Sequence, residues 1–204
     1  MQEDRFYFVI NQYERIILCL PCSLIDIFRH DFIEARYVND NVCDIVIYSH
    51  DIMELVETLH DGLMQALAHQ ITLDILLKND LGYEWNEYLD NHKKASSYAS
   101  IPEWIGQRYF MWSSYGIAVW LYEKKNKIFL EITPTYKWHF QDPMFTEKSQ
   151  YISYEQFINN YKPYAVIELN TDKLQEWLKQ TERLLAIINS NDEKFMNCKI
   201  TKEE

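Results

Sequence analysis

The amino-acid sequence predicts an α+β protein: a single domain in which a mixed or antiparallel sheet packs against amphipathic helices. Three observations support this fold class. Short runs of β-branched and aromatic residues recur along the chain, two helical stripes of apolar residues lie between and after them, and two of the runs are close enough to form a hairpin. Because hairpins pair strands antiparallel, the pattern disfavours a doubly wound parallel sheet. We expect the domain to span residues 1–191 and a charged C-terminal tail to occupy 192–204.

Strand signals dominate the first fifty residues. Strands are predicted over 5–10 and 15–20, joined by a turn, and again over 43–48, because each run is rich in apolar and β-branched side chains. Between the second and third runs, Ser23 followed three residues later by Asp26 resembles a capping box. This pair predicts a short helix at that place.

The clearest helix of the first half begins after Ser49. Its apolar residues follow the i, i+3, i+4, i+7 spacing of one helix face. They are Ile52, Leu55, Val56, Leu59, Leu63, Ala66 and Leu67. At about 100° per residue, the opposite face has three acids. These are Glu54, Glu57 and Asp61. The pattern leaves open whether the helix ends near Gln70 or continues to Lys78.

The second half alternates short helices with strands and ends in a long helix. Short helices are predicted over 85–90 and 153–161. Strands are predicted over 108–112, 117–122, 128–132 and 165–169, the middle two forming the hairpin. Thr171 is expected to cap the final helix, which has a regular apolar stripe. The stripe consists of Leu174, Trp177, Leu178, Leu184, Leu185 and Ile188.

All of the net charge lies in one stretch of the chain. Residues 26–90 contain fourteen acids and three bases, and this window alone accounts for the net charge of −11. Such segregation predicts a surface that meets something positive, namely a basic protein, a cation or a positively charged ligand. It argues against nucleic-acid binding, because a protein that neutralises phosphates needs a basic stripe.

The composition excludes several kinds of site. The four glycines are too widely spaced for a loop that cradles phosphates, so no nucleotide cofactor is expected. No HExxH pair occurs among the six histidines, and His50 with Glu54 gives only two metal ligands at i, i+4 spacing, so no metal is expected either. The N-terminus lacks the positive region of a signal peptide, and the apolar run 16–20 is too short to span a membrane. We therefore expect a cytoplasmic protein that does not bind membranes.

The Cys19-Leu-Pro-Cys22 motif is the sharpest candidate for chemistry. It follows a predicted strand and precedes a predicted helix, and a helix N-terminus lowers the pKa of a thiol. The motif thus indicates a thiol-redox enzyme as one alternative. The simpler interpretation is that both cysteines are small buried side chains with structural roles.

An acidic and aromatic surface is the candidate for partner binding. Acids steer a basic partner toward the surface, and aromatic side chains supply most of the binding energy of interfaces. The predicted residues are Asp51, Glu54, Glu57, Asp61, Glu84, Trp85, Glu87, Tyr88, Asp90 and Trp104. The competing interpretation is an ordinary solvated helix face for the acids and core packing for the rings.

Three runs lie between Trp112 and Ile188 in a characteristic order: WLYEKKNKIFLEITPTYKW, YISYEQFINNYKP and the closing helix LQEWLKQTERLLAII. In this layout the chain resembles small bacterial immunity proteins, which accompany polymorphic toxins and contact-dependent inhibition systems. The resemblance implies a cytosolic single-domain protein that binds one cognate toxin and blocks it. Many such toxins are basic nucleases, which an acidic partner suits.

Together these features predict a non-enzymatic inhibitor that occludes a basic toxin enzyme through the acidic and aromatic surface. Two alternatives remain open. One is an enzyme with a dispersed active site, with Cys19 and Cys22 as its only pointer. The other is a regulatory or scaffold domain of a bacterial system. The oligomeric state is left open.

Overall fold

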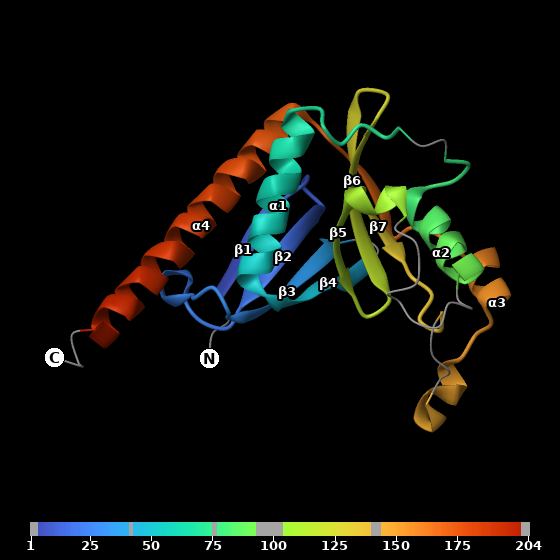
Figure 1. Cartoon of the computed structure of the whole chain (residues 1–204), viewed down its shortest axis with the longest axis horizontal. Helices are drawn as coiled ribbons and strands as arrows, with labels where there is room; N and C mark the ends of the chain where they lie inside the picture. The colour runs from blue at the N-terminus through green and yellow to red at the C-terminus, as the bar shows by residue number, and fades with distance from the viewer. Residues whose placement is uncertain (1–3, 41–42, 75–76, 93–103, 140–143, 201–204) are drawn as a thin grey trace. The chain divides into compact units, whose positions relative to one another are not determined.

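The computed structural model describes residues 4–40, 43–74, 77–92, 104–139 and 144–200 (Figure 1). The chain is an α+β protein with two four-stranded antiparallel sheets and helices packed against them, which confirms the predicted fold class. It divides into two compact units. Unit 1 comprises Met1–Gln70 and Leu169–Glu204, and unit 2 comprises Ile71–Glu168. That the chain folds as one cooperative domain stays a prediction.

The sheet of unit 1 is a meander of four consecutive strands. These are β1 (Asp4–Val9), β2 (Glu14–Leu20), β3 (Phe32–Asn39) and β4 (Cys43–Asp51), each antiparallel to the next. The turn between β1 and β2 is built on Asn11, whose Oδ1 accepts hydrogen bonds from the backbone N–H groups of Tyr13 and Glu14 at 2.8 and 3.0 Å. This local hydrogen bonding is what makes Asn a turn residue.

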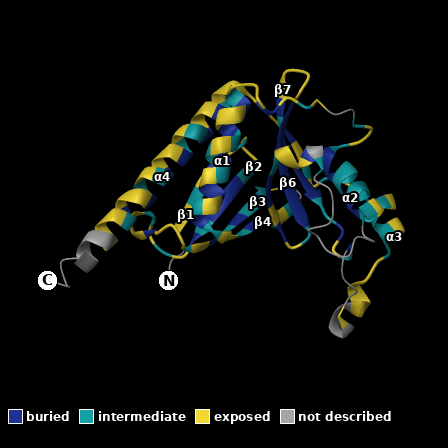
Figure 2. Ribbon diagram, viewed as in Figure 1, coloured by how far each residue is buried: buried dark blue, intermediate teal, exposed yellow. Residues whose placement is uncertain are grey.

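Two helices cover one face of this sheet. They are α1 (Ile52–Leu67) and α4 (Thr171–Ile200), which lie side by side, and the short 3₁₀ helix η1 (Leu24–Asp26) contacts α4 (Figure 1). In both long helices the apolar side is buried and the opposite, polar side is exposed (Figure 2). Trp177 attaches α4 to strand β1. Its ring packs edge-on against Phe8 with centroids 5.5 Å apart, and its Nε1 donates to the carbonyl of Val9 at 3.1 Å.

Unit 2 holds the second sheet, with strand order β5-β6-β7-β8. Its elements are α2 (Leu81–His92), the 3₁₀ helix η3 (Ile105–Tyr109), β5 (Phe110–Ser114), β6 (Ile117–Lys124), β7 (Lys127–Pro134), the 3₁₀ helix η4 (Phe145–Gln150), α3 (Tyr154–Asn159) and β8 (Ala165–Leu169). The expected hairpin is β6–β7. Its turn residues Lys125 and Asn126 both have positive φ, at 54° and 60°. Two-residue hairpin turns whose twist matches that of the flanking strands require positive φ at both positions.

The predicted cap residues were wrong at α1 and α4, and the capping box predicted at η1 is not formed. Asp51 caps α1 in place of Ser49, because β4 continues through residue 51 and the cap must lie where the strand ends. Ser23 is the N-cap residue of η1 as expected, but its side chain makes no capping hydrogen bond, and the helix has only three residues. At α4 the capping side chain is Asn170, whose Oδ1 accepts from the N–H of Lys173 at 2.8 Å, and the expected cap Thr171 lies inside the helix.

Two further elements differ from the sequence prediction. Strand β3 was not predicted, and α4 continues to Ile200, so residues 192–200 of the expected tail are helical. Helix α1 ends at Leu67, near the earlier of the two expected ends. Among the helices in the described residues, none combines the length and the apolarity that crossing a bilayer requires.

Candidate functional site

Four of the predicted partner-binding acids lie together on unit 1. They line one hollow of about 480 Å³, and its lining consists of Arg29, His30, Asp51, Met53, Glu54, Glu57, Thr58 and Asp61. Helical spacing places Glu54, Glu57 and Asp61 on the face opposite the buried stripe of α1. The side chains of Glu54 and Asp61 are 62% and 73% exposed, so their charges face solvent. The hollow is therefore acidic and open to an approaching partner.

Asp51 has a structural role within this hollow. Its Oδ1 accepts from the N–H of Met53 at 2.8 Å, which caps α1, and its Oδ2 lies 2.7 Å from Nδ1 of His30. Burial alone raises the pKa of Asp51, but the hydrogen bonds from His30 and from two backbone N–H groups at the start of the helix outweigh it and lower the pKa. Asp51 thus ties the loop before β3 to the start of α1 and stays ionised.

Two other acids of the stripe also have a histidine beside them. His50 Nδ1 lies 3.3 Å from Glu54 Oε2, and His60 Nδ1 lies 3.2 Å from Asp61 Oδ1. The pair His50 and Glu54, considered from the sequence as two metal ligands, is therefore a mutual contact. Within the part of the chain that the structure describes, no group of three or more His, Cys, Asp or Glu side chains is placed to hold a metal ion.

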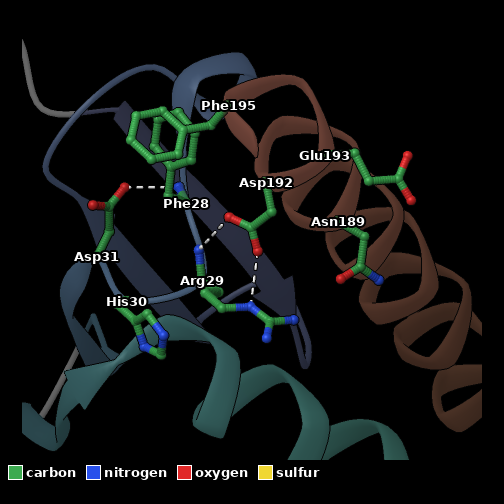
Figure 3. A pocket seen from close by; sticks show the side chains of 8 residues that line it. All are labelled: Phe28, Arg29, His30, Asp31, Asn189, Asp192, Glu193 and Phe195. Atoms are coloured by element: carbon green, nitrogen blue, oxygen red, sulfur yellow. Dashed lines mark hydrogen bonds and ion pairs between the residues drawn. The ribbon is translucent and has the colours of Figure 1, made fainter. Parts of the chain in front are cut away.

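A second, larger hollow of unit 1 was not expected from the sequence. It measures about 970 Å³ and is lined by Phe28, Arg29, His30, Asp31, Asn189, Asp192, Glu193 and Phe195 (Figure 3). The loop after η1 supplies one wall and the C-terminal part of α4 the other. Arg29 joins the walls, since its Nε donates to Asp192 Oδ2 at 2.8 Å across a separation of 163 residues. No local pattern could have revealed such a distant pairing.

Glu84 and Glu87, two of the three predicted acids of unit 2, have hydrogen-bond partners within that unit. Glu84 accepts from the N–H of Asn79 at 3.1 Å, and Glu87 accepts from the hydroxyl of Tyr154 at 2.7 Å. Asp90 is half-buried on α2. Glu84 and Glu87 therefore help to hold α2 in place, and all three acids are less exposed than those of the α1 stripe.

The three predicted aromatic anchors form one cluster in unit 2. Trp85 stacks on Tyr88 with ring centroids 5.8 Å apart, and Trp104 lies 5.5 Å from Trp85. Both tryptophans contact the fully buried ring of Trp120 edge-on. All three anchors are half-buried, so the cluster covers the core with one side and leaves the other accessible.

The thiols lack the setting of a redox site. Cys19 and Cys22 are not joined by a disulfide, and the helix after them is the three-residue η1, too short to stabilise a thiolate. Burial raises the pKa of Cys22, and the nearby carboxylates of Asp31 and Asp26 raise it further. A reactive thiol needs a lowered pKa, so this geometry favours structural roles.

Unit 2 also contains a fully buried carboxylate, Glu131 on β7. Its Oε1 accepts from the N–H of Gly82 at 2.8 Å, and its Oε2 accepts from the hydroxyl of Tyr122 at 2.9 Å. Burial raises the pKa of Glu131 to about 7. The close approach of α2 explains why residue 82 is glycine, because an added Cβ would come within 2.5 Å of Thr133 Cβ. We assign Glu131 the role of holding the start of α2 on the sheet.

Comparison of the chain with protein-family models, with curated proteins and with solved structures gives no match. The likeness of residues 112–188 to immunity proteins stays a prediction from their layout.

Proposed function

We propose that this chain is a non-enzymatic, cytoplasmic binding protein that blocks a basic enzyme, as the resemblance to bacterial immunity proteins implies. The observation that supports the proposal best is the hollow lined by Asp51, Glu54, Glu57 and Asp61. These four acids, which the sequence analysis selected, line one concave surface together.

The mechanism of inhibition is occlusion. A basic enzyme that acts on nucleic acid presents cations where it expects phosphates, and clustered carboxylates occupy those positions. Charges of one sign in a concave surface raise the local concentration of the partner and its association rate. The aromatic cluster of Trp85, Tyr88 and Trp104 is a second predicted contact area, and its role is to slow dissociation.

The two alternative functions lack a comparable observation. The raised pKa of Cys22 removes support from a thiol-redox enzyme. A regulatory or scaffold domain would bind a partner without inhibiting it, and the experiment below separates that case.

The test is capture of the partner from a lysate of the source organism, followed by binding kinetics and an activity assay on the captured protein. We expect a basic protein whose activity falls when one equivalent of the chain is added. Replacing Glu54, Glu57 and Asp61 together with Lys should slow association at low salt by at least tenfold, on the order of the gain that electrostatic steering supplies. Raising the ionic strength should slow the wild-type association in the same way.

A matched control separates local from overall charge. The exposed acids Asp172, Glu176 and Glu182 of α4 line neither hollow, and their joint replacement with Lys changes the net charge equally. This control should associate much faster than the α1 variant. Equal slowing in both variants, or a captured protein whose activity the chain leaves unchanged, would refute the proposal.

A further inference from the structure

The two hollows of unit 1 meet. Arg29 and His30 line both of them, so the acidic hollow along α1 passes into the larger hollow between the loop after η1 and α4. Figure 3 shows Phe28 and Phe195 together at one end of the larger hollow, with Arg29 and His30 toward α1. The combined surface therefore has an aromatic end and an acidic end. We call it the α1–α4 groove.

The charge of the groove is strongly one-sided. Its lining includes seven carboxylates and a single guanidinium. Arg29 is the one Lys or Arg side chain of this lining, its Nε is already paired with Asp192, and the imidazole of His30 contacts Asp51. The excess of carboxylates would repel an anionic occupant, whereas a cationic occupant would be complementary to them.

The aromatic end of the groove supplies exposed apolar surface, which the acidic end lacks. The rings of Phe28 and Phe195 pack edge to face with centroids 5.7 Å apart, and yet they remain 36% and 49% exposed. Ile25, close by in the chain, is 72% exposed. Apolar side chains that face an open hollow gain from burial against an apolar group of a partner.

We propose that the α1–α4 groove binds a basic segment of the protein partner in which one apolar side chain lies next to several Lys or Arg residues. The apolar side chain packs against the exposed surfaces of Phe28 and Phe195, and the cations lie along Glu54, Glu57 and Asp61. This inference rests on the proposed function, because it names the part of the basic partner that the acidic surface recognises.

Two probe peptides test this recognition directly. One is a capped peptide with a leucine followed by a glycine and four lysines, and the other has glycine in place of the leucine. Both are titrated into the full-length, isotope-labelled chain and followed by NMR. We expect the leucine peptide to bind about tenfold more tightly, with shifts at Phe28 and Phe195 as well as along α1.

Variants assign the difference to the aromatic end. Phe28→Ala with Phe195→Ala should reduce the affinity for the leucine peptide about tenfold, to that of the glycine peptide, and should leave the glycine peptide unchanged. Phe195→Ala alone provides a milder variant. Met64→Ala is the control, since Met64 is 48% exposed on α1 and lines neither hollow. Circular dichroism checks that each variant is folded.

The outcomes separate this inference from the proposed function. Equal affinities for the two peptides, no binding of either, or a leucine preference that survives loss of both rings would overturn the groove proposal. None of these results changes the capture experiment, in which charge reversal on α1 and inhibition of the partner decide the proposed function. A leucine preference that disappears with the rings supports the groove.

Discussion

Glu131 is a carboxylate that the fold holds in an unusual state. It is fully buried, and burial raises its pKa to about 7, with the negative charge of Asp80 acting in the same direction. Hydrogen bonds from Gly82 and Tyr122 favour the ionised form but do not compensate for the loss of water. Tyr161 donates its hydroxyl to Asp80 in the same buried region. These groups make Glu131 sensitive to pH in the neutral range.

Glu131 should therefore lower the stability of the chain as pH rises. Its folded pKa of about 7 lies above the ordinary value of 4.5, so the folded state holds the proton more tightly. Between these pH values the unfolded chain ionises first, and the free energy of unfolding falls by an amount on the order of 3 kcal/mol. Above pH 7 this loss is complete. Glu131→Gln should remove that part of the pH dependence in urea unfolding between pH 4.5 and 8.

The control for this measurement is Glu168→Gln, because Glu168 is an exposed carboxylate paired with Lys127. It should leave the pH dependence close to that of the wild type. A Glu131→Gln variant whose unfolding free energy follows pH as the wild type does would show that Glu131 titrates normally.

At the scale of elements, the spacing of apolar residues correctly predicted the buried face of α1 and the strands of the β6–β7 hairpin. The apolar stripe of α1 is buried at every predicted position except the half-buried Leu67, and both strands of the β6–β7 hairpin lie where the sequence placed them. The unpredicted strand β3 also has a signal: Ile33, Ala35 and Tyr37 are buried and alternate with charged or half-buried residues. A search for continuous apolar runs misses such a half-buried strand, whereas alternation at period two detects it.

The stripe of α1 leads to a prediction about stability. Leu59 is 2% exposed at the centre of the helix, so Leu59→Ala removes packed methyl groups and should lower the free energy of unfolding by about 2–5 kcal/mol. The exposed Met64 of the same helix is the control, and Met64→Ala should cost less than about 1 kcal/mol. Chemical denaturation of the two variants checks this. Similar losses in both would mean that the buried face of α1 is assigned wrongly.

At the scale of the whole molecule, the path of the chain limits what the sequence reveals. Unit 1 is built from two separate stretches, and Ile71–Glu168 is inserted between α1 and α4. Trp177 belongs to the core of a sheet whose strands end before residue 52. The larger hollow has the same origin, because Phe28 and Phe195 meet only after α4 packs on unit 1. Charge and helical spacing predicted the acids of α1 from the sequence. The larger hollow depends on contacts between distant segments, which no local pattern predicts.

This path also predicts how the chain opens. Trp177 and Trp120 are both fully buried, the first in unit 1 and the second in unit 2. Truncating a buried tryptophan to alanine costs about 3–5 kcal/mol, which raises local opening by on the order of a hundredfold or more. If the units open separately, Trp177→Ala should speed amide hydrogen exchange in β2, β3 and α1 and leave β6 and β7 protected, whereas Trp120→Ala should do the reverse. Hydrogen exchange followed by mass spectrometry measures both variants. Uniform acceleration along the chain in each would show instead that the two units unfold as the single domain expected from the sequence.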